Sequence, residues 1–127
     1  MKKTTLGPGE LIEAVELPYP AKPAKSFFRK IGTRSAQAIS KTVGAGLLWT
    51  AGGKVSDCRL AFGSVAPTVR RLKTVEDFLK GKRLTPALAK EAAALTAKDI
   101  SPIDDLRSTR AYRLAVTANL VRDFLST

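Results

Sequence analysis

The amino-acid sequence predicts an α+β fold: a small antiparallel sheet of three to four strands from the N-terminal part, covered on one face by about three helices from the C-terminal part. Up to Pro67, glycine and residues that favour strands are frequent. Beyond Pro67, alanine, leucine and charged residues replace them, which favours helices. A chain of 127 residues can bury a core, so residues 1–127 are expected to form a single domain.

The first part of the chain contains two candidate strands separated by a stiff connector. Residues Glu10–Leu17, ELIEAVEL, mix acidic and aliphatic side chains and stop at Pro18, which is typical of an edge strand. Residues 18–25 contain three prolines and are expected to be extended. Residues 26–32 are the second candidate strand, and the polar stretch 33–41 follows it.

A β-hairpin is expected next. Its first strand ends near Thr50, Gly52 and Gly53 supply the turn, and the second strand covers Val55–Gly63. Cys58 is expected to be a small buried residue rather than a reactive thiol, because no neighbouring motif indicates thiolate activation. The alternation of the second strand places Cys58, Leu60 and Phe62 on one face, and Asp57 and Arg59 on the other.

Two helices are expected after Pro67. In the first, Thr74 is the predicted N-terminal cap, Asp77 can reach back to it, and Gly81 ends the helix. In the second, Thr85 is the cap and Pro86 takes the first helical position, where the missing N–H of proline is harmless.

The last helix is expected over Thr109–Leu125, preceded by two adjacent acids. Asp104 and Asp105 point about 100° apart on a helix, so they cannot converge on one substrate atom as an acid–base pair must. Ser101 and Asp104 instead predict a capped helical turn, and Asp104 can meet Arg107 on its surface. The apolar stripe predicted for the last helix consists of Leu114, Ala118, Val121 and Leu125.

Composition excludes several kinds of chemistry. The chain has no histidine and one cysteine, so no metal-binding cluster or histidine-based nucleophile is expected, and no residue is assigned a catalytic role. The glycines in GPG and GAG lack the spacing of a phosphate-binding loop. No apolar run is long enough for a membrane span or a signal peptide, so a cytoplasmic location is expected.

The net charge of +11 raises the alternative of a small basic nucleic-acid-binding domain. The charge is spread along the chain, because residues 1–63 carry 10 basic and 4 acidic side chains and residues 64–127 carry 12 and 7. The densest basic groups have no aromatic residues among them for base stacking. Spread, solvated cations are therefore favoured, and steep salt dependence of DNA or RNA binding would distinguish the alternative.

Four segments carry a family resemblance: KTTLGPGELI (3–12), RSAQAISK (34–41), LAFGSVAPT (60–68) and SPIDDLRSTRAYR (101–113). In this order they resemble the C-terminal domain of the FAD-binding subunit of the xanthine dehydrogenase and carbon monoxide dehydrogenase family of molybdenum hydroxylases. The resemblance runs from about Lys3 to Leu125.

This resemblance implies a non-catalytic domain of an oxidoreductase that packs on an FAD-binding domain. Such a subunit transfers electrons between the iron-sulfur clusters of a small subunit, FAD and an external acceptor, while a large subunit holds the molybdenum cofactor. The N-terminal FAD-binding domain is expected to be absent from this chain, so the chain alone is not expected to bind FAD. The resemblance places Arg34, Gln37, Ile39 and Lys41 near the flavin ring, with Ile39 nearest. The residues themselves leave a second interpretation open, in which Ile39 is core and the others form a solvated loop.

Overall fold

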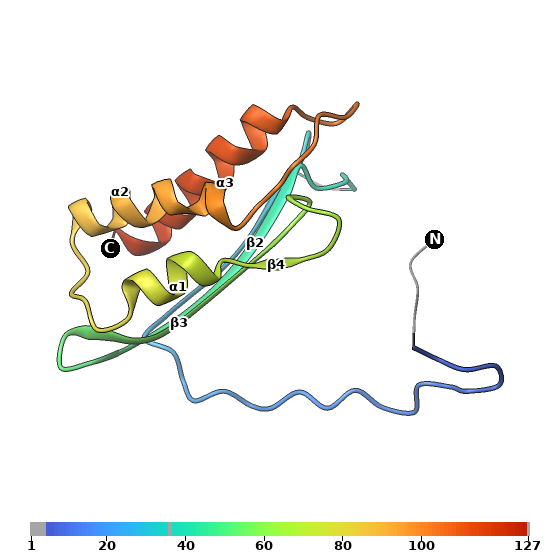
Figure 1. The fold of residues 1–127 in the computed structure, drawn as a ribbon, viewed down its shortest axis with the longest axis horizontal. Helices are drawn as coiled ribbons and strands as arrows, with labels where there is room; N and C mark the ends of the chain where they lie inside the picture. Colours follow the sequence, from blue (N-terminus) through green and yellow to red (C-terminus); the bar gives the residue numbers. More distant parts are fainter. Residues whose placement is uncertain (1–4, 36, 127) are drawn as a thin grey trace.

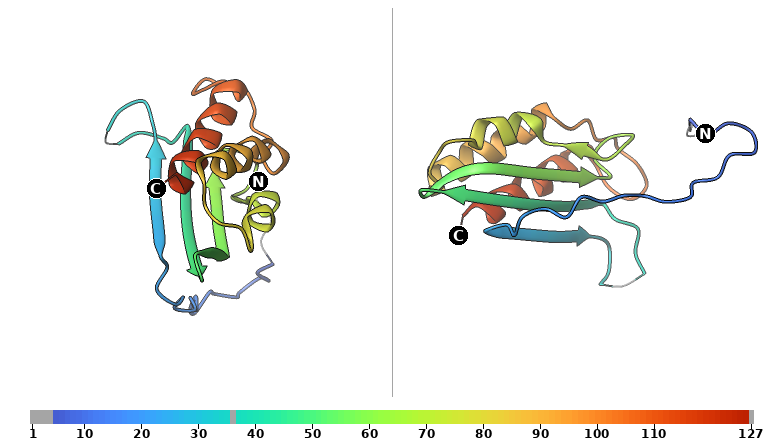
Figure 2. Two further views of the ribbon diagram at one scale, coloured as in Figure 1. Left: turned by 90° about the vertical axis from the view of Figure 1, so that its left-hand side faces the viewer. Right: turned by 90° about the horizontal axis from the view of Figure 1, so that it is seen from below.

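The computed structural model describes residues 5–35 and 37–126 and confirms the α+β fold. A four-stranded antiparallel sheet has the order β1-β2-β3-β4, and the helices pack against one of its faces (Figures 1 and 2). In the described ranges, no helix is long and apolar enough to cross a membrane. The elements are β1 (Lys25–Ile31), β2 (Thr42–Ala51), β3 (Lys54–Gly63), β4 (Arg70–Arg71), α1 (Lys73–Leu79), α2 (Pro86–Leu95), the 3₁₀ turn η1 (Thr96–Lys98) and α3 (Arg110–Leu125).

The predicted hairpin is confirmed as β2 and β3. Gly52 and Gly53 form its turn with φ angles of 57° and 72°, a left-handed conformation that residues with a Cβ adopt only at a cost. The side chain of Cys58 is buried, as expected from the alternation of β3.

Glycines in β2 bring aromatic rings close to the sheet. A Cβ on Gly44 would lie 2.4 Å from the ring of Phe62, and one on Gly46 would lie 2.3 Å from the ring of Phe27. Phe27 in turn stacks against Phe124 of α3, with ring centroids 4.7 Å apart. The glycines of the GAG sequence therefore make room for the rings that join the sheet to α3.

The core lies between the sheet and the helices. Leu60 and Phe62 of β3 are completely buried, and so are Leu72 and Val75 at the start of α1. Side chains from every helix close this layer, because the apolar face of an antiparallel sheet must be covered on one side. The buried hydrophobic residues include Leu48, Val55, Cys58, Val65, Leu79, Ala89, Ala92, Ile100, Val121, Phe124 and Leu125.

The predicted cap is correct for α2 and wrong for α1, and α3 has a cap that was not predicted. Thr85 accepts a hydrogen bond from the N–H of Leu88 at the start of α2, and Thr109 does the same for Tyr112 at the start of α3. Helix α1 has no side-chain cap from its own N-cap residue. Instead, Asp99, distant in sequence, accepts hydrogen bonds from the N–H and hydroxyl of Thr74 at 3.0 and 2.7 Å.

The buried stripe of α3 differs from the predicted one. Val121 and Leu125 are buried as expected, but Leu114 and Ala118 are only partly buried. The two inner positions of the first turns are instead Arg113 and Thr117, 4% and 0% exposed. Apolar periodicity missed them because a buried arginine follows no hydrophobic pattern.

The edge strand predicted over residues 10–17 is wrong for this sheet. Among the described residues, 5–24 form no strand and extend away from the body as an arm (Figures 1 and 2). The indole N–H of Trp49 on β2 donates a hydrogen bond of 2.8 Å to the carbonyl of Ala21 and so holds the base of the arm. We refer to residues 5–24 as the N-terminal arm.

Candidate functional site

The connection between β1 and β2, residues 32–41, contains every residue predicted to lie near a flavin. It is closed by the N–H of Lys41, which donates to the carbonyl of Ile31 at 2.7 Å. Within it, the guanidinium of Arg34 donates to the carbonyl of Gln37 at 2.7 Å, and Gln37 has a φ angle of 50°. This connection is therefore a folded loop, shaped by its own backbone contacts.

The loop brings its predicted residues to one pocket. Arg34, Gln37, Ile39 and Lys41 all line a pocket of about 320 Å³. The side chain of Ile39 is 63% exposed. Because an isoleucine with that exposure is not part of the core, the interpretation of Ile39 as a core residue is wrong. The other residues of this pocket are Thr33, Ala38 and Arg107.

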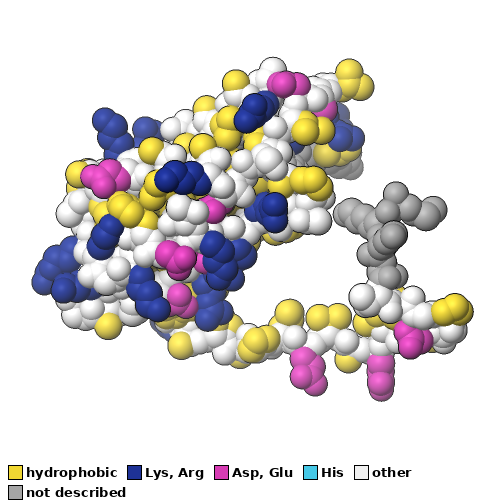
Figure 3. Space-filling model, in the orientation of Figure 1, with side chains coloured by type: hydrophobic (Ala, Val, Ile, Leu, Met, Phe, Trp, Pro, Cys, Tyr) yellow, Lys and Arg dark blue, Asp and Glu magenta, His cyan; other side chains and the backbone are white. Residues whose placement is uncertain are grey.

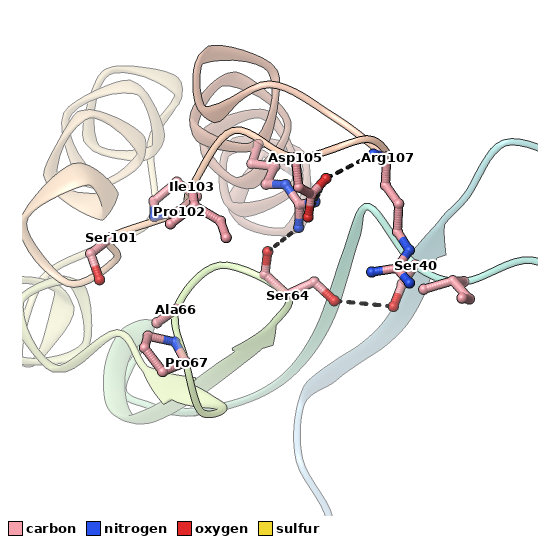
Figure 4. A pocket seen from close by; sticks show the side chains of 11 residues that line it. Ser40, Ser64, Ala66, Pro67, Ser101, Pro102, Ile103, Asp105 and Arg107 are labelled. Atoms are coloured by element: carbon pink, nitrogen blue, oxygen red, sulfur yellow. Dashed lines mark hydrogen bonds and ion pairs between the residues drawn. The ribbon is translucent and has the colours of Figure 1, made fainter. Parts of the chain in front are cut away.

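A larger pocket of about 390 Å³ shares Ile39 and Arg107 with the first. Figure 4 shows the side chains of Ser40 and Ser64 facing one another on one side of it, with Pro102 and Ile103 across from them. The two serine hydroxyl oxygens are 3.3 Å apart. The pocket combines aliphatic walls with hydroxyl groups and one cationic edge, a mixture that suits packing against an apolar group with polar substituents. Its lining is completed by Ala66, Pro67, Ser101, Asp105 and Arg113.

Arg113 joins the segments that form these pockets. From α3, its guanidinium donates to the carbonyls of Lys41 and Ser64 at 3.0 and 2.6 Å. It also donates to both carboxylate oxygens of Asp105 at 2.8 Å each. Both bonds to Asp105 come from one nitrogen, Nη2, while Nη1 serves the two carbonyls. Hydrogen bonds between ionised partners are stronger than those between neutral groups. One side chain thus positions the end of the β1–β2 loop, the end of β3 and the loop before α3 relative to one another.

The two adjacent acids have different roles from those predicted. Residues 101–104 form no helical turn, and no bond joins Asp104 to Arg107 in the described structure. Asp104 accepts a hydrogen bond of 2.7 Å from the N–H of Arg110 at the start of α3, so it serves that helix instead. Asp105 accepts from the N–H groups of Arg107 and Ser108 at 2.8 and 3.0 Å, in addition to Arg113.

These contacts hold the pKa of Asp105 below its ordinary value. The hydrogen bond from the backbone of Arg107 has the largest effect, and those from Ser108 and the guanidinium of Arg113 act in the same direction. A carboxylate kept ionised in this way accepts hydrogen bonds and balances a buried cation. It is poorly suited to donate a proton near neutral pH.

Cys58 and Glu76 are buried polar groups away from this loop. Burial raises the pKa of the Cys58 thiol to about 12, and the neighbouring charge of Glu76 adds to the effect. The carboxylate of Glu76 accepts from the N–H of Leu60 at 2.8 Å and from the guanidinium of Arg71 at 2.6 and 2.7 Å. The Cys58 thiol is packed in the core and the Glu76 carboxylate is paired, so neither has the features of a reactive site.

Basic side chains do not gather into one band on the face drawn in Figure 3. Lysine and arginine are dispersed over the helices and the hairpin end, with acidic residues between them. Arg71 and Arg113 are paired with Glu76 and Asp105, respectively. This arrangement matches solvated and paired charges better than a nucleic-acid groove.

A model of the family described as "CO dehydrogenase flavoprotein C-terminal domain" matches residues 27–127. The chain belongs to this family. The match covers the whole sheet after its first two residues, all the helices and both pockets, and it excludes the N-terminal arm.

Two longer relatives are similar in sequence. The domain is 31% identical over 119 residues to the nicotine 6-hydroxylase medium subunit of Paenarthrobacter nicotinovorans, covering 94% of this chain and 41% of the relative. It is 28% identical over 113 residues to the glyceraldehyde dehydrogenase medium chain of Sulfolobus acidocaldarius, covering 89% and 40%. The chain therefore spans about two-fifths of the length of these relatives.

A solved structure supports the same relationship. A chain of carbon monoxide dehydrogenase from Hydrogenophaga pseudoflava, in a form that lacks the Mo-pyranopterin moiety of the molybdenum cofactor, superposes with a TM-score of 0.74 at 30% identity. The superposition covers 84% of this chain and 37% of that one. The order of strands and helices seen here is thus a known architecture of this family.

The sequence singled out residues of the loop, whose place beside a flavin stays a prediction, but not the residues that support the loop. These supports, Arg113, Ser64 and Arg107, come from three other segments. Ser64 has a φ angle of 63°, unusual for a residue other than glycine, and its carbonyl receives the shortest bond from Arg113. The one sequence signal for these supports was an arginine, Arg113, in the last helix. Its role could be recognised only once the structure showed that its side chain is buried.

Proposed function

We propose that this chain is the C-terminal domain of the flavoprotein subunit of a molybdenum hydroxylase and that it docks on an FAD-binding domain through the loop of residues 32–41. In that assembly, electrons pass between iron-sulfur clusters, FAD and an external acceptor. The subunits that carry the iron-sulfur clusters and the molybdenum cofactor are the further partners. The domain itself contributes a shaped surface and no catalytic residue.

The observation that supports this proposal is the exposed position of Ile39 on a fixed loop. A large aliphatic side chain that is 63% exposed stands where two pockets meet, with the cations Arg34, Lys41 and Arg107 around it. Domains that pack on one another keep such apolar groups on their surfaces. The loop also lies within residues 27–127, which match the family described as "CO dehydrogenase flavoprotein C-terminal domain".

The residues fit one part of FAD. The Ile39 side chain suits contact with a flat apolar ring, and neighbouring cations suit a ring that gains negative charge on reduction. No glycine-rich loop for the FAD phosphates accompanies them in this sequence. When bound, FAD supplies electron transfer, and this chain would supply one wall of the ring site while the partner domain holds the rest.

The test is Ile39→Glu in the full chain. The variant should remain folded, because the side chain already faces water. Its affinity for a separately expressed cognate FAD-binding domain should fall by ~10-fold or more, because docking would bury an unpaired charge. Isothermal titration calorimetry measures this loss.

Ala87→Glu is the matched control. Ala87 is exposed at the start of α2, which lies at the opposite end of the molecule from the β1–β2 loop (Figure 1). This variant should dock like the wild type. Unfolding of Ile39→Glu, or equal docking of both variants, would contradict the proposal.

A further inference from the structure

The N-terminal arm exposes a row of apolar side chains. Leu11, Ile12, Val15 and Leu17 are 92%, 68%, 75% and 84% exposed, and Tyr19 is fully exposed. Figure 3 shows this segment as a thin strip that stands apart from the body, with an open space between them. So many apolar side chains in water on one segment indicate a surface that is covered in the assembled protein.

The residues 10–17 have the character of a strand that lacks a neighbour. They contain Val and Ile, lack glycine and proline, and run as an extended segment (Figure 1). In this described stretch, the one backbone hydrogen bond is from the N–H of Glu10 to the carbonyl of Gly7. An extended segment of this kind satisfies its backbone by joining the edge of another sheet. Its side chains then alternate between the two faces of that sheet.

The connector explains why this segment does not join its own sheet. Pro18, Pro20 and Pro23 lie between residue 17 and β1. Proline-rich chain is extended and rises about 3.1 Å per residue, so it resists the reversal that pairing with the free edge of β1 requires. The hydrogen bond from Trp49 to Ala21 fixes the direction in which this stiff connector leaves the sheet.

The N-terminal arm has a counterpart in a longer relative. The family model begins at residue 27 and so spans 101 residues of this chain. The alignment to the nicotine 6-hydroxylase medium subunit covers 119 residues, so at least 18 aligned residues precede the family domain. The arm is therefore related to a part of that subunit outside its C-terminal domain, in a protein of which this chain covers only 41%.

We propose that residues 10–17 form a β-strand on the edge of a sheet in the FAD-binding domain, so that the two domains are joined at two points. The arm and the loop of residues 32–41 extend toward the same end of the molecule (Figures 1 and 2). A partner held by both would be fixed in orientation as well as position.

The acidic residues of the arm indicate the charge expected on the partner strand. Glu10, Glu13 and Glu16 are the only charged residues between Thr5 and Ala21. Beside the added strand, the partner sheet should therefore carry lysine or arginine, because like charges on neighbouring strands are destabilising. This inference rests on the proposed docking to an FAD-binding domain.

Hydrogen–deuterium exchange of the full chain, with and without the separately expressed FAD-binding domain, tests the pairing. Docking should slow exchange at alternate amides between residues 11 and 17, because every second N–H of an edge strand faces its partner. If the domain docks and these amides exchange as before, the strand proposal is wrong while the proposed function stands. If the domain does not dock at all, the proposed function is contradicted, and the strand proposal that rests on it is contradicted as well.

Proline substitution provides a second, independent measurement. Ile12→Pro, Ala14→Pro and Glu16→Pro remove the N–H groups of one alternating set, and Glu13→Pro and Val15→Pro those of the other. Each is compared with alanine at the same position, so that loss of the side chain is separated from loss of the N–H. One set should weaken docking by ~10-fold or more and the other by less than about 3-fold. Equal effects from both sets would exclude edge pairing.

Sedimentation of the chain alone tests whether a second copy of the chain, instead of the FAD-binding domain, pairs with residues 10–17. The free chain should be monomeric, with rapid exchange throughout residues 10–17. A dimer with these amides protected would mean that a second copy occupies the strand, and it would overturn the assignment to the FAD-binding domain.

Discussion

Two segments of this protein lack helices and long strands, and they are held in opposite ways. The loop between η1 and α3, residues 99–109, is fixed at several points: Asp99 to Thr74, the N–H of Ser101 to the carbonyl of Val65, and Asp105 to Arg113. The N-terminal arm has the bond from Trp49 to Ala21 at its base and a local turn that joins Gly7 to Glu10.

This difference shows that irregular backbone can be as well determined as a helix when other segments satisfy its polar groups. In the loop, each acidic residue bonds a group of another element. Asp99 accepts from the start of α1, Asp104 accepts from the start of α3, and Asp105 pairs with Arg113 of α3. In the arm, apolar side chains such as Leu11 and Val15 remain exposed, because the rest of the domain does not cover them. The loop is therefore held by its own domain, whereas the arm leaves its apolar side chains exposed.

The largest effect is expected at Arg113, which fixes the loop. Arg113→Met should lower the free energy of unfolding by about 3 kcal/mol, because it leaves the carbonyls of Lys41 and Ser64 and the carboxylate of Asp105 without their shared donor. Urea denaturation followed by circular dichroism measures the change. Arg122→Met on the same helix, where the side chain is 51% exposed, is the control and should change stability by less than about 0.5 kcal/mol. Equal losses in the two variants would show that Arg113 contributes no more to stability than an exposed arginine.

A smaller effect separates the adjacent acids. Asp105→Asn should destabilise the protein more than Asp104→Asn, because Asp105 pairs with a buried guanidinium while Asp104 bonds one exposed backbone N–H. Thermal denaturation of both variants at pH 7 provides the comparison. A greater loss of stability from Asp104→Asn would show that the bond at the start of α3 matters more than the pairing with Arg113.

The pH dependence sharpens the same comparison. The folded-state pKa of Asp105 lies below its ordinary value of 3.8, so its contribution to stability is complete above that value and is lost as the pH falls through the folded pKa. Unfolding measured from pH 7 down to pH 2 should therefore show a shallower acid decline in Asp105→Asn than in the wild type. Superimposable acid declines would be inconsistent with an ionised, hydrogen-bonded Asp105.

The smallest effect is expected in the arm. Leu11→Ser and Val15→Ser should each change the free energy of unfolding of the isolated chain by less than about 0.5 kcal/mol, because both side chains are already in water. Denaturation midpoints measure this, with Val121→Ser, fully buried on α3, as the destabilised reference. A clear loss of stability in either arm variant would show that the arm packs on its own domain.

Much of the fold was predictable because its signals are local. Gly52 and Gly53 determine the hairpin turn, Thr85 and Pro86 the start of α2, and Thr109 the start of α3, since each acts on residues within a few positions. The family resemblance also directed attention to residues 34–41, several of which line one pocket, and their place beside a flavin stays a prediction. The geometry of the candidate site did not follow from the sequence, because Arg107 and Ser64 come from other segments.

By itself, the sequence determined the hairpin and the three helices that follow it, because the alternation of β3 and the composition change after Pro67 depend on neighbouring residues alone. Only the tertiary structure decided which polar groups are buried and which apolar ones are left exposed. Arg113 bonds a carbonyl 72 residues away, and Asp99 caps a helix that begins before it, so neither partnership has a local signal. The strand-like pattern of residues 10–17 is likewise local, whereas the presence of a neighbouring strand depends on where the folded chain, or a partner, places one.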